Sequence, residues 1–404
     1  MSYIVPYIAG QGLNNQLWEY RAAAIVARAF NRTLCLEPVL RFYLTTTGRE
    51  FIPFDELFDV DAIATYARVT VGGGRCARAC GGRIHRMIAL IDKTAQISKV
   101  PYRIADWRPG SLIKFGGSTG FKEVPMPTFH LQRRHVSAFQ NLSAVAQDLG
   151  SIVSGARCVG LQGTGRLLDV EEEKALWVEA LRTSPMLVQV ARQVRRELFS
   201  GEPYLAIHWR FEETKCAGYG LGIGSGRSVG EFHRRRPPTV TKGHGNLCFF
   251  AGTIPGIVTT QIWLRLVSKE QVAATVKRVA ANHGLKHVFL ATDGKDAELI
   301  GWVKHATGAV TLSDLPRGWM SFVDNDVTSR LEQQICQDAN VFMGTQGSSW
   351  TLSVMQDRLK REGKVNLPRS NSVSLLSSNS SMFFDVEVCD CEWTSEDTRT
   401  TVGP

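Results

Sequence analysis

The stretch EQQICQDANVFMGTQGSSWTLSVMQDR, from Glu332 to Arg358, decides the fold class of this sequence. Its apolar pattern predicts the end of one helix, a short strand at Val341–Gly344 and a second helix over Ser348–Lys360. Strands that alternate with helices are typical of βαβ units, which build a mainly parallel sheet. The late part of the chain is therefore predicted to be an α/β domain.

The same alternation extends outward from this stretch in the sequence. Further expected strands lie at Tyr3–Ala9, Leu34–Leu36, Tyr204–Arg210, Val288–Thr292 and Ala309–Leu312, and expected helices at Asn15–Phe30, Asp296–His305 and Ser329–Asn340, with a partly broken helical region at Val170–Phe199. Because the 404 residues exceed the roughly 250–300 at which single cores stop growing, two domains are expected. Punctuation at Gly201–Glu202–Pro203 places their boundary near residue 200.

The predicted division is an N-terminal domain at 1–200, a C-terminal domain at 201–390 and a disordered tail at 391–404. Two segments, 65–150 and 214–256, show little periodicity. The second is rich in glycine and is long for a loop, so it is either a flexible loop or an insertion that binds a substrate.

The composition is that of a soluble globular protein, with 44% apolar and 21% charged residues. No apolar run approaches the roughly 20 residues of a membrane helix, and the start MSYIVPYIAGQG lacks the features of a signal peptide. The net charge of +9 would attract an anionic partner, but no aromatic residues are interleaved with the basic ones as in nucleic-acid-binding proteins. The nine cysteines form no zinc-binding CxxC pairs, and both disulfides and free thiols remain open.

A Gly-containing turn joins the first strand to the first helix in AGQGLNNQLWEYRAAA, Ala9 to Ala24. Such a turn places the backbone N–H groups near Gly12 and Leu13, and the positive end of a helix dipole, at the carboxyl edge of a sheet. This is a seat for an anion. A capped helix after a turn explains the same residues without any ligand.

The strand YLAIHWR ends in His208 and Arg210, which are two residues apart and so point to the same face. Ligands in open α/β sheets bind beyond the carboxyl ends of the strands, where an arginine can clamp a diphosphate. An ion pair of Arg210 with Glu212 or Glu213 is the alternative.

Three further polar positions lie at comparable places. Ser348 and Ser349 stand at a predicted helix start, and Asp293 ends the strand VFLATDG. Each is explained equally well as a helix cap. Glu332 is suited to accept hydrogen bonds from a base, or is a solvated carboxylate on a helix.

Together these stretches resemble the GDP-fucose protein O-fucosyltransferases, the family that modifies EGF-like and thrombospondin repeats. The resemblance rests on GQGLNNQ for the early Gly/Asn loop, NRTLCLEP and FIPFDELFDVDAI after it, HWR for a His-x-Arg motif, and EQQICQDANVFMGTQGSSWT with a following DR for the C-terminal signature. It spans both domains, with gaps at 65–150 and 214–256. It implies a GT-B fold, in which two Rossmann-like domains face each other across a cleft.

The resemblance also implies roles for individual residues. Arg210 matches the catalytic arginine that contacts the β-phosphate and the glycosidic oxygen, and Asn15 matches the essential asparagine of the early loop. The residues implied in nucleotide binding are Gly12, Leu13, His208, Asp293, Glu332, Ser348, Ser349, Trp350 and Arg358. Glu332 stands where the family usually has Asp, and Gly12–Leu13 lacks the Arg or Glu often found there, which leaves open whether a general base exists.

The implied reaction is transfer of fucose from GDP-fucose, as the donor substrate, to a Ser or Thr hydroxyl of a protein, with inversion and without a metal or other cofactor. Of the two DxD triplets, Asp59–Asp61 is interpreted as a turn or helix start, and Asp324–Asp326 follows a short apolar run. The alternatives are a glycan fucosyltransferase of the same fold and a non-catalytic GDP-sugar-binding or lectin-like protein. Asn15 and Arg210 argue against the latter.

The family implies the lumen of the endoplasmic reticulum or Golgi. The sequons at Asn31–Thr33, Asn141–Ser143 and Asn379–Ser381 fit that compartment, although such triplets also arise by chance. Neither a nucleic-acid partner nor a membrane segment is expected, and the acceptor and the oligomeric state stay open.

Overall fold

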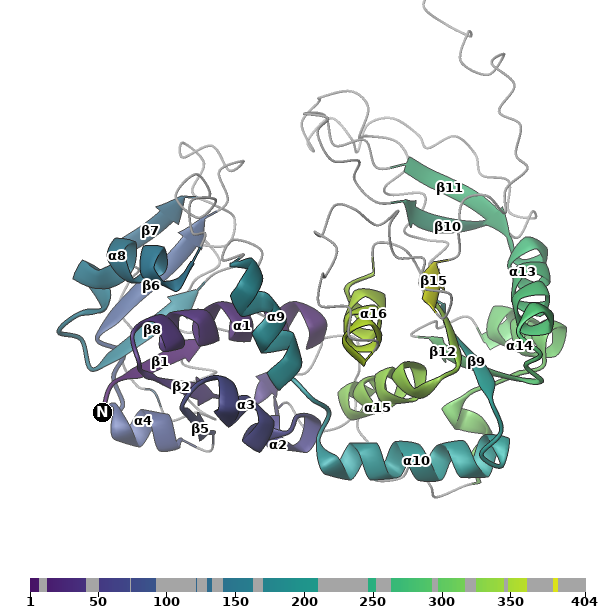
Figure 1. Cartoon of the computed structure of the whole chain (residues 1–404), viewed down its shortest axis with the longest axis horizontal. Coiled ribbons are helices and arrows are strands. Elements are labelled where there is room, and N and C mark those ends of the chain that lie inside the picture. Colours follow the sequence, from purple (N-terminus) through teal and green to yellow (C-terminus); the bar gives the residue numbers. More distant parts are fainter. Residues whose placement is uncertain are drawn as a thin grey trace, which may run out of the picture. The chain divides into compact units, whose positions relative to one another are not determined.

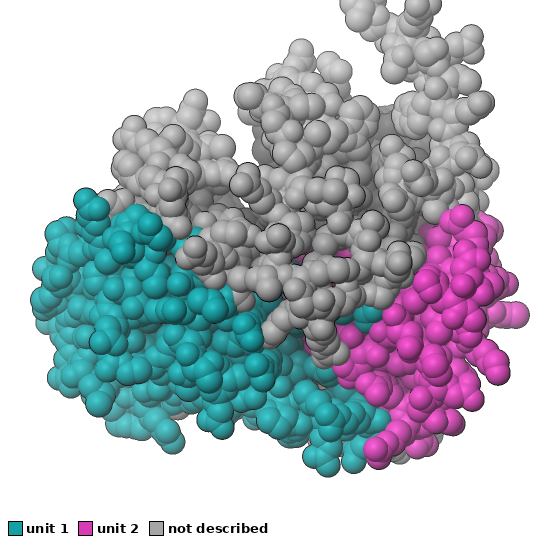
Figure 2. All heavy atoms as spheres, viewed as in Figure 1, with its two compact units in different colours: residues 1–194, 317–334, 356–367 teal, residues 195–316, 335–355, 368–404 magenta. Residues whose placement is uncertain are grey.

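The structure is a computed structural model, and it describes residues 1–6, 13–40, 51–72, 74–91, 121, 129–132, 141–162, 170–209, 246–251, 263–292, 297–316, 325–344, 348–361 and 381–383. The chain divides into two compact units, drawn in teal and magenta in Figure 2. Unit 1 consists of Met1–Val194, Arg317–Gln334 and Gln356–Leu367, and unit 2 of Arg195–Pro316, Ile335–Met355 and Pro368–Pro404.

Unit 1 is built on a six-stranded sheet in which all neighbouring strands are parallel (Figure 1). In sheet order its strands are β5 (Val69–Val71), β2 (Thr33–Leu36), β1 (Tyr3–Pro6), β8 (Cys158–Gln162), β6 (Arg86–Ile91) and β7 (Phe129–Gln132). Every residue of β1 and β2 is buried, as expected for parallel strands covered on both faces. A separate antiparallel pair joins β3 (Val39–Leu40) to β4 (Phe51–Ile52).

Helix α1 (Leu13–Ala29) packs against β1, β2 and β8. Its segment Ala22–Ala27 is fully buried, because small and branched apolar residues allow the helix to lie close to the sheet. The helix ends at Ala29, and Asn31 has a φ of 49°, the left-handed conformation that often follows a helix end. The other helices of the first half are α2 (Phe54–Leu57), α3 (Val60–Tyr66), α4 (Arg75–Ala79), α8 (Leu142–Val153), α9 (Glu171–Ala180) and α10 (Pro185–Phe199).

Two disulfides hold α4 on the sheet of unit 1. Cys35–Cys76 joins α4 to β2, and Cys80–Cys158 joins the residue after α4 to β8. Since β2 and β8 flank β1, the two bonds anchor α4 on both sides of the central strand. The sequence left the pairing open, and among the described residues the structure pairs these four cysteines, whereas Cys336 is buried and in neither disulfide.

Unit 2 contains a five-stranded parallel sheet. Its strands in order are β13 (Ala309–Val310), β12 (His287–Thr292), β9 (Tyr204–Trp209), β14 (Val341–Gly344) and β15 (Ser381–Phe383). Numbered along the chain, this is the order 3-2-1-4-5 of a Rossmann fold. Its other elements are α13 (Lys269–Asn282), α14 (Ala297–Thr307), the short 3-10 helix Leu312–Asp314, parts of α15 (Asn325–Asp338) and α16 (Ser349–Arg361), and the hairpin of β10 (Asn246–Ala251) and β11 (Trp263–Ser268).

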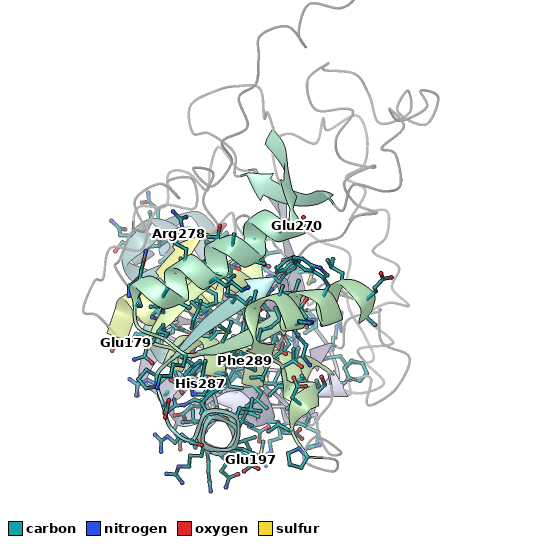
Figure 3. All side chains as sticks on the ribbon, turned by 90° about the vertical axis from the view of Figure 1, so that its right-hand side faces the viewer. Glu179, Glu197, Glu270, Arg278, His287 and Phe289 are labelled. Atoms are coloured by element: carbon teal, nitrogen blue, oxygen red, sulfur yellow. A yellow bond between two sulfur atoms is a disulfide. The ribbon has the colours of Figure 1, made fainter. Side chains whose placement is uncertain are left out.

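Aromatic rings fill the core of unit 2 beside the sheet. Phe199, at the end of α10, stacks on Tyr204 with ring centroids 4.5 Å apart. It also meets His287 and Phe289, which are two residues apart in β12 and are labelled in Figure 3, at 5.7 Å and 6.4 Å. Each such aromatic pair contributes roughly 0.5–1.5 kcal/mol of stability beyond the effect of the buried area. The start of β9 is thereby fixed.

The predicted α/β class with Rossmann-like halves is confirmed. The strand at Val341–Gly344 is as predicted, and the broken region 170–199 proves to be two helices, α9 and α10. Ser184 caps α10, because its hydroxyl accepts a hydrogen bond from the N–H of Leu187 at 3.4 Å, and Pro185 occupies the first helical position. In the segment that resisted interpretation, 65–150, the described residues include β5, α4, β6, β7 and α8. Among the described helices, none is both long and apolar enough to span a bilayer.

Candidate functional site

In the sheet of unit 2 the strand order reverses between β9 and β14. From β9 the chain order continues through β12 to β13 on one side, whereas β14 and β15 lie on the other side. The register pairs Leu205 with Val341 and Ile207 with Met343, so both strands end at the same edge. In open α/β sheets the crevice at such a point, beyond the carboxyl ends of the strands, is where ligands bind.

His208 lies at this edge, near the end of β9, and is 3% exposed. Its Nδ1 is 2.7 Å from the hydroxyl oxygen of Thr351, and its ring stacks on the indole of Trp350 with centroids 4.0 Å apart and planes 19° apart. A ring that is stacked on one face and hydrogen-bonded at its edge has a fixed orientation. The contact with Thr351 and the stacking on Trp350 thus set the position of the imidazole at the carboxyl edge of the sheet.

Helix α16 begins at the same edge. Ser348 is buried at 4% exposure, its carbonyl accepts a hydrogen bond from the N–H of Leu352 at 3.0 Å, and its hydroxyl lies 3.5 Å from the N–H of Thr351. Ser348 is therefore the N-cap of α16, and Ser349 is its half-buried first residue. The positive end of the helix dipole is placed next to the fixed imidazole, an arrangement that attracts a phosphate.

Gly344 ends β14 and allows α16 to approach. A Cβ at this position would overlap the methyl group of Thr351 and would lie 3.0 Å from its hydroxyl oxygen. Thr351 is fully buried, so it has little room to move. The absence of a side chain at Gly344 thus permits the contact between Thr351 and His208.

In unit 1 the comparable reversal of strand order lies between β1 and β8, and α1 is the helix that follows β1. Leu13, the first residue of α1, is buried at 4% exposure. Asn14 is also buried, and its side-chain oxygen accepts a hydrogen bond of 3.0 Å from the amide of Gln333 on α15. The amide oxygen of Gln333 in turn accepts a hydrogen bond of 3.0 Å from Arg330.

Arg330 is 1% exposed and fixes the amide of Gln333 by this hydrogen bond. Its guanidinium lies over the ring of Phe58, 4.9 Å from the centroid, and its Nη1 is 3.9 Å from a carboxylate oxygen of Asp357. The half-buried Asp357 and the buried Arg330, Gln333 and Asn14 thus form a polar series that ends at the first turn of α1. The sequence did not indicate Asn14, Gln333, Arg330 or Thr351. No local pattern marks a contact over 319 positions, as between Asn14 and Gln333, or over 143, as between His208 and Thr351.

The remaining predicted site residues fall into two groups. Gly12, Arg210 and Asp293 lie outside the described residues, next to α1, β9 and β12, and Asn15 is the third residue of α1 but its side chain is also outside them. The others are described: Glu332 is half-buried on α15 beside Gln333, and Arg358 is buried on α16 beside Asp357, both in unit 1.

The structure thus brings His208, Ser348, Ser349 and Trp350 together in unit 2. Leu13, Glu332 and Arg358 belong to unit 1. The triplet that starts at Asp59 is a helix start, as interpreted, since Asp59 caps α3 by accepting a hydrogen bond of 3.1 Å from the N–H of Ala62.

Two Rossmann-like units in one chain match the GT-B fold of glycosyltransferases. Residues 3–360 match the sequence profile of the GDP-fucose protein O-fucosyltransferases. The chain belongs to this family, and the expected enzyme class, a fucosyltransferase that uses GDP-fucose, is confirmed by that membership. Among curated proteins, no sequence matches this one significantly.

Solved structures share the fold. A structure of POFUT1 in complex with GDP-fucose aligns with a TM-score of 0.58 and 15% identity, covering 95% of this chain and 99% of that one. Another, of POFUT1 in complex with GDP, aligns with a TM-score of 0.56 and 16% identity over 95% and 98% of the two chains. A structure of the NodZ α-1,6-fucosyltransferase soaked with GDP-fucose aligns with a TM-score of 0.46 and 12% identity over 88% and 92% of the two chains.

Proposed function

We propose that this protein transfers fucose from GDP-fucose to a Ser or Thr hydroxyl of a protein acceptor, with inversion at the anomeric carbon and without a metal ion. The observation that carries the proposal is the group formed by His208, Thr351 and Trp350 at the start of α16. It lies where a Rossmann fold binds nucleotides, and Arg210 follows His208 by two residues.

The departing GDP carries the charge that this site would stabilise. The acceptor hydroxyl attacks the anomeric carbon from the face opposite the nucleotide and loses its proton, while the bond from that carbon to the β-phosphate oxygen breaks. Negative charge then develops on the diphosphate, for which the helix-start N–H groups and the guanidinium of Arg210 are suited donors. Preorganised groups of this kind contribute about 3–4 kcal/mol each to the rate. They would take over the role of a metal ion.

A protein acceptor and a lumenal location are supported by separate observations. The family to which the chain belongs is named for protein acceptors. The disulfides Cys35–Cys76 and Cys80–Cys158 are typical of proteins that fold in an oxidising compartment. Asn31, in the first sequon, is exposed and so accessible to glycosylation.

Calorimetric titration of the full-length protein tests the donor and the metal requirement together. We expect GDP-fucose to bind in the presence of EDTA, and GDP-mannose and UDP-sugars to bind weakly or not at all. Arg210→Ala should abolish transfer, with an unchanged far-UV spectrum to show that the fold is intact. Arg195→Ala, a surface change on α10, is the matched control and should keep full activity.

The acceptor is tested by offering a folded, disulfide-rich repeat and a free oligosaccharide to the same preparation. Fucose on the repeat alone supports the proposal, and fucose on the oligosaccharide alone replaces it with a glycan fucosyltransferase. Metal-dependent binding, a preference for UDP-sugars, or near-normal turnover of Arg210→Ala would overturn the proposed mechanism.

A further inference from the structure

Glu37 is a buried carboxylate with no hydrogen-bond partner among the described residues. The residue is 1% exposed, and neither of its two side-chain oxygens has a hydrogen-bond partner among the described residues. Burial of an unpaired carboxylate costs several kcal/mol, so such groups are normally paired with a cation or coordinate a metal. Among the described residues no group hydrogen-bonds to either side-chain oxygen of Glu37, so both oxygens are available to bind an ion.

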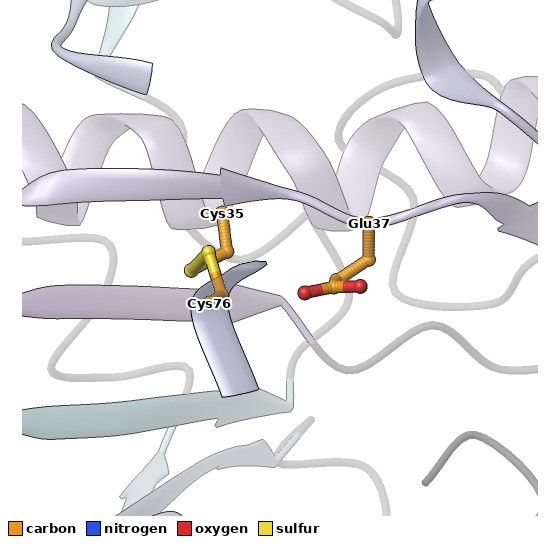
Figure 4. Close-up of side chains that lie close together, drawn as sticks. All are labelled: Cys35, Glu37 and Cys76. Atoms are coloured by element: carbon orange, nitrogen blue, oxygen red, sulfur yellow. A yellow bond between two sulfur atoms is a disulfide. The ribbon is translucent and has the colours of Figure 1, made fainter. Parts of the chain in front are cut away.

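Two sulfur atoms, which are potential metal ligands, lie close to the carboxyl group of Glu37. Cys35 and Glu37 are two residues apart at the end of β2, so their side chains lie on the same side of the strand, and Cys76 approaches from α4. Figure 4 shows the carboxyl group of Glu37 on the side of the strand where the Cys35–Cys76 disulfide lies. One carboxylate oxygen and the two Sγ atoms all lie within 4.8 Å of one another.

The second disulfide of the same helix provides a contrast. Cys80–Cys158 lies in one apolar cluster with Cys35–Cys76, together with Tyr3, Val5 and Ile84. Among the described residues, however, no His, Asp or Glu joins Cys80 and Cys158 in a group with metal-ligand spacing. Both disulfides anchor α4, but among the described residues only Cys35–Cys76 has a carboxylate beside it.

We propose that reduction of Cys35–Cys76 creates a zinc site, in which Cys35, Cys76 and Glu37 bind one ion. A thiol or phosphine reductant supplies two electrons, and with two protons the disulfide becomes two thiols while the reductant is oxidised. Binding of Zn²⁺ then releases both thiol protons and, below the pKa of Glu37, its carboxyl proton as well. The ion is held by two thiolates and one carboxylate oxygen. This ligand set and the compact spacing suit Zn²⁺, which accepts sulfur and oxygen donors in tetrahedral geometry.

The consequence for the fold is that one link replaces another. In the oxidised chain a covalent bond joins α4 to β2, and in the reduced chain the metal joins the same two residues. The ion also supplies the positive charge next to Glu37. The proposal thus explains why a carboxylate is buried beside one of two otherwise similar disulfides.

Cobalt binding to the full-length protein tests the site, because Co²⁺ bound to thiolates has a charge-transfer band in the near ultraviolet. We expect no band before reduction and, after anaerobic treatment with a phosphine, one bound Co²⁺ per chain that Zn²⁺ displaces. Cys35→Ser should abolish the band. Glu37→Gln, which keeps the size of the side chain, should weaken binding by roughly tenfold or more, since even outer-shell changes weaken metal sites this much.

The double variant Cys80→Ser/Cys158→Ser is the matched control, because it removes the disulfide that has no carboxylate. It should bind Co²⁺ as the reduced wild type does, and far-UV spectra should show that each variant is folded. Three outcomes would overturn the proposal: no binding to the reduced wild type, binding that persists in Cys35→Ser, and affinity unchanged in Glu37→Gln. If Cys35→Ser fails to fold, the affinity of Glu37→Gln for Co²⁺ still tests the proposal.

Discussion

Helices α16 and α1 each begin where the strand order of a parallel sheet reverses, but the first turns of the two helices contact different parts of the chain. At α16, in unit 2, Ser348 caps the helix from the preceding position, and Thr351 and Trp350 in the first turn contact His208 of β9. At α1, in unit 1, Asn14 is held by Gln333 from a helix more than 300 residues further along. The cap of α16 is thus encoded locally, whereas its contact with His208 and the contact of Asn14 both form only after distant elements have docked.

The largest predicted effect sets the polar series of unit 1 against an ion pair of unit 2. Arg330→Met keeps an apolar contact with Phe58 but removes the charge beside Gln333 and Asp357, and should lower the free energy of unfolding by about 3 kcal/mol. Arg195→Met breaks the 2.7 Å pair with Asp338, but the Arg195 side chain is 32% exposed, so the loss should stay within about 1 kcal/mol. Urea unfolding of both variants measures the difference, and equal losses would contradict it.

The same contrast explains what the sequence could and could not predict. The strands and helices around α16 follow from short periodic runs, and the serines before it were recognised as a cap or a phosphate contact. The pairing of Gln333 with Asn14 could not be predicted, since two amides carry no sign of each other at that separation. The pairing of the four cysteines was equally out of reach, because spacing does not fix disulfide connectivity.

Glu37 makes the stability of unit 1 depend on pH. Burial raises the pKa of Glu37 from 4.5 to about 7 in the folded protein. The unfolded chain therefore loses the proton first, so the contribution of Glu37 to stability is fully present below pH 4.5, falls as the pH rises toward 7 and then levels off. The nearby Tyr20 does not titrate in this range, since burial raises its pKa well above 10.

In the oxidised protein without added metal, this fall should amount to on the order of 3 kcal/mol. Glu37→Gln should remove it, leaving the slope of the other groups. Urea midpoints of the wild type and the variant between pH 4 and pH 8 give the difference directly. Parallel curves for the two proteins would show that a group outside the described residues pairs with Glu37.

Two glycines test how tightly each sheet is packed against its neighbours. A Cβ on Gly344 of β14 would overlap Thr351, which is β-branched and fully buried, whereas a Cβ on Gly160 of β8 would overlap the sulfur of Met87, an unbranched and adaptable side chain. Gly344→Ala should therefore cost about 2–3 kcal/mol and Gly160→Ala about 1 kcal/mol. Only Gly344→Ala should also weaken GDP-fucose binding, because it displaces the partner of His208. Thermal unfolding and calorimetry report the two effects separately.

The smallest effects come from removing one hydrogen bond at each helix start, and they separate the roles of the two units most sharply. Thr351→Val removes the hydroxyl 2.7 Å from Nδ1 of His208, and Gln333→Leu removes the amide that binds Asn14. Each should cost about 1–2 kcal/mol of stability, as expected for a buried hydrogen bond. If unit 2 holds the donor, Thr351→Val raises the Kd for GDP-fucose, whereas Gln333→Leu leaves that Kd near its normal value and lowers kcat through the first turn of α1, where Asn15 lies. A Kd that rises equally in both variants would show that the start of α1 contributes to donor binding as much as α16 does.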